Sequence, residues 1–427
     1  MDDLSELEDL YIAATGYLIC LQYFQNIRKR KLQEQEEENA RKRQKRTRKA
    51  VKMWFGHNDT LLVELEQEDL GSYRNYLRME PETFKEILDR ITPRIQKEET
   101  QFGNTISPRL RLSATLRFLA TGASSKTIGY AFRISYQIFC TFLIEVCQAI
   151  IDEFSEEVIV TPTTPEAWKE VAKGYWERWN FPHCIGAIDG KHVALRKPRK
   201  SGSEFHNYKG FFSIVLLAIV DSDYKFLYVD VGQTGCGSDA GVFSLTEMFT
   251  SLNEGKAGLP EPEPLPGEED RGRDIGYFLV GDDAFALKPW MMKPIPQRYM
   301  AREKRIFNYR LSRARRVVEN VFGILSSRFR CLLTTMQQEP DRVATITMAC
   351  CVLHNLLRLR NPSATDPGHD GGAGDATDDR GIAGEMHDLG TPYRGHNPSR
   401  AAKEQRDYLL DFVNSPHGSV PWQDGKI

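Results

Sequence analysis

The spacing of hydrophobic residues changes along this chain of 427 residues. Apolar residues recur at helical spacing over 61–160, whereas short uninterrupted apolar runs follow residue 181. The first pattern is typical of amphipathic helices, and the second is typical of buried strands in an α/β domain. We therefore expect the following regions: a charged helical arm (1–60), an all-α region (61–160), a linker helix (161–180), an α/β domain (181–360), a disordered Gly/Asp-rich segment (361–395), and a C-terminal helix and tail (396–427).

The all-α region ends in a pattern with the spacing of a helix-turn-helix. A helix is expected over 108–121, a short one over 124–131 and a long one over 136–154, with Ser135 as its N-cap. The long helix is apolar and nearly lacks the Arg and Lys that recognition of base edges needs, so a purely structural helical bundle is the alternative. If this region binds DNA, its phosphate contacts are expected from Arg109, Arg111, Arg117 and Lys126.

Two apolar strands of the α/β domain end at acidic residues. The run 185–188 is followed by Asp189, and the run 277–280 leads to the pair Asp282 and Asp283. α/β proteins place their chemistry at the carboxyl ends of central strands. Neighbouring residues on a strand point to opposite sides, so only one of the later pair can face Asp189. A turn aspartate at a strand end is the alternative for Asp189.

A glutamate on a predicted helix completes a set of oxygen ligands. Glu319 stands beside the apolar face of a helix over 315–323. Carboxylates suit Mg²⁺ or Mn²⁺, and such a set can hold two ions about 3.5–4 Å apart. The alternative is a solvated glutamate paired with Arg315 or Arg316. Asp239 opens another predicted helix and is either a fourth acid at the metals or an N-cap.

These acids lie in sequence strings that resemble those of the PIF/Harbinger superfamily of DDE transposases. The same strings resemble the Harbinger-transposase-derived nucleases of animals and the ALP1-like proteins of plants. The resemblance covers approximately residues 60–360 and the C-terminal tail. Its strings are IGAIDGKHV (185–193), NYKGFFSIVLLAIVD (207–221), GCGSDAGVF (235–243), LVGDDAFALKP (279–289), FNYRLSRARRVVENVFG (307–323) and VPWQ (420–423).

The resemblance implies a fold and a chemistry. It implies a ribonuclease-H-like mixed sheet flanked by helices, with Asp189, Asp282 and Glu319 as catalytic, metal-binding acids. The family places its second acid directly after a glycine, which favours Asp282 over Asp283. It also implies metal-dependent cleavage of DNA, strand transfer by the freed 3′-hydroxyl, and a separately encoded Myb-like DNA-binding partner.

Two other functions stay open at the level of sequence. One is a domesticated, non-catalytic chromatin or adaptor protein that keeps the transposase fold, as the ALP1-like relatives do. The other is glycoside hydrolysis by two carboxylates, which is a weaker alternative because the acids lack sugar-stacking aromatic neighbours and have basic flanks.

Positive charge is concentrated in segments although the net charge is only −2. Clusters at 28–31 (RKRK) and 41–49 (RKRQKRTRK) predict nuclear import, with a cytoplasmic pool left open; a solvated charged helix is the alternative. Basic residues also flank the acids, as expected for a partner that carries phosphate charge. The predicted DNA phosphate contacts are Arg310, Arg313 and Arg316 at helical spacing, together with Lys191 and Lys209.

Composition excludes some classes of protein. No apolar run is long enough to cross a bilayer, so no membrane association is expected. The eight cysteines form no CxxC pair and predict free thiols in a reducing compartment. The segment 255–276, rich in Pro, Gly and Glu, predicts a disordered insertion. The sequence leaves open the DNA target and the choice between a monomer and a homo-oligomer.

Overall fold

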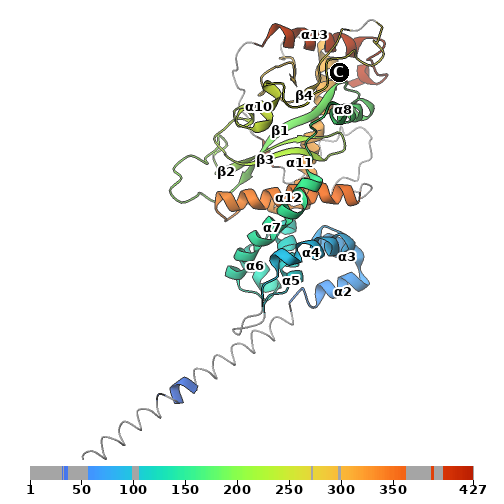
Figure 1. Ribbon diagram of the computed structural model, residues 1–427. Coiled ribbons are helices and arrows are strands. Elements are labelled where there is room, and N and C mark those ends of the chain that lie inside the picture. Colours follow the sequence, from blue (N-terminus) through green and yellow to red (C-terminus); the bar gives the residue numbers. More distant parts are fainter. Residues whose placement is uncertain are drawn as a thin grey trace, which may run out of the picture.

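The computed structural model describes residues 31, 33–36, 56–98, 105–270, 273–296, 300–361, 386–388 and 398–426. Nearly all of the two N-terminal basic clusters and most of the segment 361–395 lie outside these described residues. Figure 1 shows a helical lobe, α2 to α7, on one side of the long helix α12, and the sheet on the other side.

The helical lobe forms where the hydrophobic pattern predicts helices, and serines fix their starts. Ser107, Ser124 and Ser135 each accept a hydrogen bond from a backbone N–H of the first turn. Gly122 ends one helix with the positive φ of 64° that favours glycine. The helices are α2 (Leu61–Glu68), α3 (Leu70–Leu77), α4 (Pro81–Ile95), α5 (Pro108–Thr121), α6 (Ser125–Ala131) and α7 (Tyr136–Val158).

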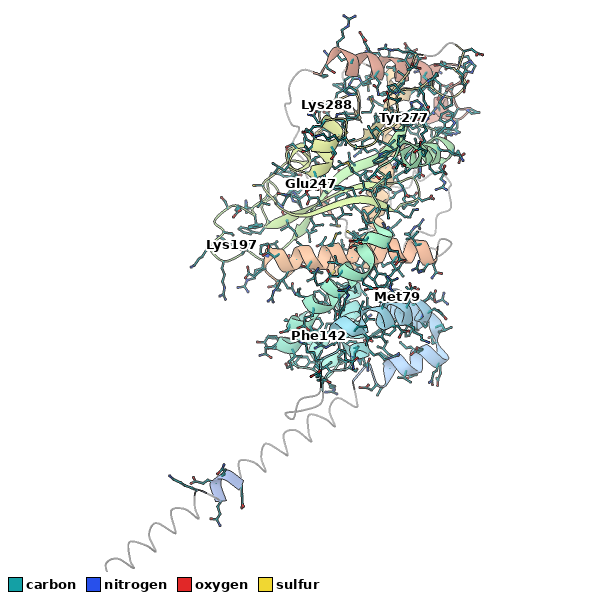
Figure 2. All side chains as sticks on the ribbon, viewed as in Figure 1. Met79, Phe142, Lys197, Glu247, Tyr277 and Lys288 are labelled. Carbon is teal, nitrogen blue, oxygen red and sulfur yellow. The ribbon has the colours of Figure 1, made fainter. Side chains whose placement is uncertain are left out.

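Helix α7 is a core element of the helical lobe. Phe139, Phe142 and Val146 are buried, and Phe142 lies inside the lobe (Figure 2). Helices α6 and α7 meet at 101°, and α7 packs against α4 and α12. Packing therefore explains the apolar composition of α7, which favours the structural bundle over a recognition helix. Within the described ranges no single helix is long and apolar enough to cross a membrane; α6 and α7 pass that test only as a bent pair.

Two arginines predicted to contact DNA phosphates are instead paired with acids of the helical lobe. Arg109 Nη2 lies 2.5 Å from Glu66 Oε2. Arg111 is buried, donates to the carbonyl of Ile95 at 2.9 Å and lies 3.0 Å from Glu145 Oε2. The prediction for Arg111 is wrong because its guanidinium is enclosed between helices.

The predicted α/β class with a mixed sheet is confirmed. Helix α8 (Pro165–Trp179) leads into a sheet with the strand order β3-β2-β1-β4-β5. β1, β2 and β3 are antiparallel neighbours, whereas β4 runs parallel to β1 and β5 runs parallel to β4. The strands are β1 (Cys184–Ala194), β2 (Ser213–Val220), β3 (Phe226–Thr234), β4 (Phe278–Val280), β5 (Met291–Met292) and β6 (His387–Asp388).

Strand β1 continues through Asp189. The sequence predicts a strand that ends at Asp189, and this prediction is wrong. β2 pairs with β1 in unbroken register from Ala187 to Ala194, so the polar residues stay within one strand. β4 pairs with β1 only as far as Ala187. The other edge of β1 beyond Ala187 is reached by β6, which pairs with Lys191 and His192.

Helices cover both faces of the sheet, and the sheet separates two hydrophobic cores. α11 (Arg302–Arg328) and α12 (Pro340–Arg360) pack on one face, and α12 also packs along α7. The helices α9 (Asp239–Ser244) and α10 (Glu247–Asn253) contribute to the core on the other face. The short helix η1 (Arg330–Leu333) follows α11, and α13 (Arg400–Asn414) and η2 (Gln423–Lys426) pack on α11.

The segment 255–276 is ordered where the structure describes it, which corrects the prediction of a disordered insertion. Leu265 and Ile275 are fully or almost fully buried, and Ile275 forms a β-bridge with Glu263. Trp168 of α8 donates to the carbonyl of Ala257 at 2.9 Å. A few apolar residues anchor the segment to the core. The prediction of disorder rests on the average composition of the segment, in which these few residues count for little.

Candidate active site

Asp189 lies within β1 on the face covered by α11. The residue is 6% exposed, and the main-chain register places it opposite Ala218 of β2. Burial raises the pKa of Asp189 to about 6, although the positive charges of Lys191 and Arg315 oppose the rise. The site therefore holds a carboxyl group whose proton is exchanged close to neutral pH.

Asp239 is the least satisfied acid of the site. It is 1% exposed, and neither carboxylate oxygen has a hydrogen-bond partner. Burial raises its pKa well above the usual range, and the negative charges of Asp189 and Asp282 add to the effect. Ser238 caps α9, with its Oγ accepting from Gly241 N at 3.3 Å, so the N-cap alternative for Asp239 is wrong. Two buried oxygens without a donor are the expected mark of an ion ligand.

Asp282 and Asp283 point into different surroundings. Burial raises the pKa of Asp282, and Asp282 also acts electrostatically on Asp189 and Asp239. Asp283 is 62% exposed and lies 3.0 Å from Lys293 Nζ. The structure thus brings Asp282 to the other acids and turns Asp283 towards solvent. The role of Asp282 as a metal ligand stays a prediction.

Glu319 reaches the site from α11 but is held in an ion pair. Its Oε1 lies 2.7 Å from Arg315 Nη2, one helical turn earlier, which is the alternative contact that the sequence allows. Glu319 also raises the pKa of Lys191, so its charge acts within the site. The charge of Arg315 opposes the rise that burial causes in the pKa of Asp189 and in that of Asp282. Arg315 is therefore a cation of the site and not only a helix-surface partner.

Lys191 and Asp388 join two distant parts of the chain at the site. Lys191 Nζ lies 3.3 Å from Asp189 Oδ2 and forms an ion pair with Asp388. Tyr208 donates to the carbonyl of Asp388 at 3.1 Å, and His387 packs on Phe211 with ring centroids 4.8 Å apart. As its side chain lies, Lys191 is buried among carboxylates, and its predicted phosphate contact stays a prediction.

Sequence reasoning missed Asp388 altogether. The residue falls in 361–395, where composition predicts disorder, and no local pattern marks it. The described residues 386–388 instead include strand β6, and Met386 is 6% exposed. Only the pairing of β6 with a strand almost 200 residues earlier brings Asp388 to Lys191, and that pairing leaves no signal in a single sequence.

Two of the predicted phosphate contacts on α11 are structural. Arg310 is fully buried and donates to the carbonyls of Gly418, at 3.1 Å, and Asn180, and to Gln423 Oε1 at 2.9 Å. Arg313 donates to Asn180 Oδ1 at 2.8 Å. Both guanidinium groups tie α11 to the end of α8, and Arg310 also to the C-terminal tail. Full burial makes the prediction for Arg310 wrong, whereas Arg313 is half-buried and its phosphate contact stays a prediction. Arg316 and Lys209 are exposed, and their phosphate contacts stay predictions.

The donor chemistry of the site fits a hard divalent cation. Asp189, Asp239 and Asp282 offer carboxylate oxygens, which Mg²⁺ and Mn²⁺ prefer. As the described side chains lie, no three Asp, Glu, His or Cys groups already form a complete cation site. The ammonium group of Lys191 and the guanidinium group of Arg315 supply positive charge among the acids instead. For Glu319 to join a cation at these acids, it would have to leave its ion pair with Arg315.

Comparison with known proteins identifies a family and several relatives of this chain. Residues 188–355 match the family described as DDE superfamily endonuclease. The chain is 28% identical over 263 residues to the candidate nuclease HARBI1 of Mus musculus, covering 60% of this chain and 69% of the relative. It is 25% identical over 296 residues to the protein ALP1-like of Arabidopsis thaliana, covering 68% of this chain and 71% of the relative.

A third relative has a name that refers to chromatin. The Arabidopsis thaliana protein called antagonist of like heterochromatin protein 1 is 24% identical over 258 residues, covering 60% of this chain and 63% of that protein. No solved structure matches the chain significantly.

Proposed function

We propose that this chain, whose residues 188–355 match the DDE superfamily endonuclease family, is a divalent-metal-dependent DNA endonuclease of the PIF/Harbinger type. The observation that carries the proposal is the carboxylate of Asp239, buried without a hydrogen-bond donor beside Asp189 and Asp282. Two buried acids and one half-buried acid at one place repel one another, and a divalent cation is the partner that removes this repulsion.

Each acid has a role in the proposed site. Asp189, Asp239 and Asp282 would hold the cation, and Glu319 would be available as a further ligand if it left its ion pair with Arg315. When bound, Mg²⁺ or Mn²⁺ supplies Lewis acidity and lowers the pKa of a coordinated water. Lys191 and Arg315 balance the negative charge of the acids until the cation enters. They then lie where a scissile phosphate would need counter-charges.

The proposed substrate is DNA, and a partner protein selects the sequence. Arg316 and Lys209 are exposed and suit phosphate contacts, which carry no sequence information. Most of the apolar face of α7 packs in the core, and its exposed first turn, Tyr136 to Ile138, carries no Arg or Lys to contact base edges. We therefore propose that a Myb-like DNA-binding protein supplies recognition. Strand transfer after cleavage belongs to the same proposal.

Nuclear localisation is proposed from the basic clusters at 28–31 and 41–49. Replacing the lysines and arginines of 41–49 by glutamine should leave a fluorescently tagged protein in the cytoplasm. Unchanged nuclear accumulation would contradict the proposal.

The test of the proposed function is a nicking assay on supercoiled DNA. The purified chain should nick DNA with Mg²⁺ or Mn²⁺ and not with EDTA, and the variants Asp189→Asn and Asp239→Asn should both be inactive. Asp283→Asn is the matched control and should retain activity, since its carboxylate is exposed and paired with Lys293. Activity that survives in Asp189→Asn and Asp239→Asn would refute the assignment of the site.

A non-catalytic chromatin or adaptor protein is the second candidate function. The observation that favours it is the pair of ionic contacts Lys191–Asp189 and Arg315–Glu319, which engage two of the three predicted catalytic acids. If this function is correct, metal will not change the melting temperature of the chain. A metal-dependent rise of the melting temperature that is lost in Asp189→Asn favours the nuclease.

A further inference from the structure

The helical lobe contains a cavity lined by three arginines. The cavity has a volume of about 490 Å³ and is bounded by α2, α3, α5 and η1. Arg78, at the end of α3, Arg117, on α5, and Arg330, at the start of η1, line it together with Tyr76, Leu61 and Leu65. A cavity of this size is large enough for a small ligand or one nucleotide unit of a larger one.

The three arginines are close enough to affect one another and lack acidic partners. Besides burial, the charges of Arg117 and Arg330 lower the pKa of Arg78. The Nε atom of Arg78 is buried without a hydrogen-bond partner. None of the three forms an ion pair with a carboxylate in the part of the chain that the structure describes. An anion bound here would offset the positive charge of the three arginines and accept a hydrogen bond from Arg78 Nε.

Neighbouring arginines behave differently. Arg74 pairs with Glu80 at 3.3 Å, Arg90 with Glu157 at 2.8 Å and Arg360 with Glu86 at 2.6 Å. Arg109 and Arg111 are paired as well. The helical lobe therefore pairs these other arginines with acids. The three arginines of the cavity have no such carboxylate partner among the described residues.

Contacts within the helical lobe hold two of the three arginines, Arg78 and Arg117, in place before a ligand arrives. Arg117 donates to the carbonyl of Tyr76 at 3.1 Å, and its guanidinium lies 3.9 Å from the centre of the Tyr76 ring. Arg78 donates to Asn75 Oδ1 at 2.8 Å and adopts a left-handed backbone with φ 64°. Arginines held by a ring and by hydrogen bonds lose little side-chain entropy on binding a phosphate.

We propose that this cavity binds a backbone phosphate of DNA through Arg78, Arg117 and Arg330. The choice of DNA rests on the proposed function and on the position of η1. Arg330 follows α11, and the helical rise places Arg328 about 14 Å along the axis from Glu319. Glu319 and η1 thus lie on one continuous stretch of chain, and we expect a DNA strand bound at the acids to continue towards the cavity.

The test measures binding and not cleavage. A labelled DNA duplex is titrated with the full chain in EDTA, and fluorescence anisotropy gives the affinity at several salt concentrations. Arg78→Gln and Arg330→Gln should each weaken binding about tenfold. The slope of log affinity against log salt should fall by about one unit in either variant and by the same amount in the double variant, since both residues hold one phosphate. Arg74→Gln is the matched control and should keep the wild-type slope.

A second measurement covers other ligands. The melting temperature is recorded in inorganic phosphate and in chloride at equal ionic strength. DNA affinities and slopes of Arg78→Gln and Arg330→Gln equal to those of Arg74→Gln would overturn the proposal. If phosphate still stabilises only the wild type in that case, the cavity binds a small phosphate ligand or a phosphorylated protein instead of DNA. The titration in EDTA measures DNA binding without metal-dependent cleavage. An inactive nuclease site would therefore not affect this result.

Discussion

The ammonium nitrogen of Lys191 lies 3.3 Å from Oδ2 of Asp189, and both side chains are buried. The positive charge of Lys191 offsets the negative charge of the neighbouring acids. A metal ion would offset the same charge, so a metal ion and Lys191 compete for the carboxylate of Asp189. This relationship links the stability of the metal-free chain to its affinity for cations.

Replacing Lys191 by methionine should therefore destabilise the metal-free chain and strengthen metal binding. Removing one partner of a buried ion pair costs about 3 kcal/mol of unfolding free energy. Thermal unfolding with and without Mn²⁺ measures both effects, and Mn²⁺ should raise the melting temperature more in the variant than in the wild type. Lys209→Met, at an exposed position, serves as the control. An equal response to Mn²⁺ in all three proteins would contradict the competition.

Asp282 and Asp283 offer a matched pair of variants. Asp282→Asn should lower Mg²⁺-dependent cleavage by more than about 100-fold, since even groups one step removed from a metal cost 10–100-fold. Asp283→Asn should leave cleavage within a few-fold of the wild type, because Asp283 is exposed and paired with Lys293. Activity lost only in Asp283→Asn would show that the second ligand is the other aspartate.

Metal affinity should depend on pH near neutrality. The raised pKa of Asp189, about 6, means that a proton occupies this ligand in acid and must leave when the cation binds. The affinity for Mn²⁺ should rise as the pH increases through about 6, and calorimetry in buffers of different ionisation enthalpy should detect proton release. Asp239, whose pKa burial also raises, would contribute to this dependence if it releases a proton when the cation binds. A constant affinity between pH 5.5 and pH 7.5 would argue against these ligands.

Arg310 and Arg316 should affect different properties although they lie on one helix. Arg310→Met removes three hydrogen bonds to buried acceptors and should lower the free energy of unfolding by about 3 kcal/mol or more. Arg316→Met should change it by less than about 0.5 kcal/mol. The salt slope of DNA binding should instead fall by about one unit in Arg316→Met. Chemical denaturation and salt-dependent DNA titration separate the two roles.

His354 should make the fold sensitive to acid. It is fully buried, its Nε2 lies 2.8 Å from the carbonyl of Tyr224, and burial lowers its pKa to about 3. Between pH 6.5 and pH 3 the unfolded chain binds a proton that the folded chain excludes, so stability falls as the pH falls through this window. The loss attributable to His354 is about 1.4 kcal/mol per pH unit.

His354→Gln should reduce this acid sensitivity, since glutamine does not titrate. The measurement is the free energy of unfolding at pH 7, 6, 5 and 4. His417→Gln, at an exposed position, should keep the wild-type dependence. The same pH dependence in all three proteins would contradict the role of His354.

Local sequence was enough to predict most of the elements and the order of the acids. Helix starts at Ser107, Ser124 and Ser135 follow from short-range hydrogen bonding of a serine to the next turn, which is encoded within a few residues. The buried strands around Asp189 and before Asp282 follow from uninterrupted apolar runs, because a central strand needs apolar side chains on both faces. These local rules were sufficient for the fold class and for two acids at one sheet.

Which charged residues meet depends on the tertiary structure. Asp388 reaches Lys191 by strand pairing across almost 200 residues, and Arg310 is buried because the end of α8 and the C-terminal tail close over it. Asp239 lacks a donor because Ser238 takes the cap. Burial and ion pairing depend on neighbours that are distant in sequence, and charge spacing on one helix cannot distinguish a phosphate contact from a structural arginine.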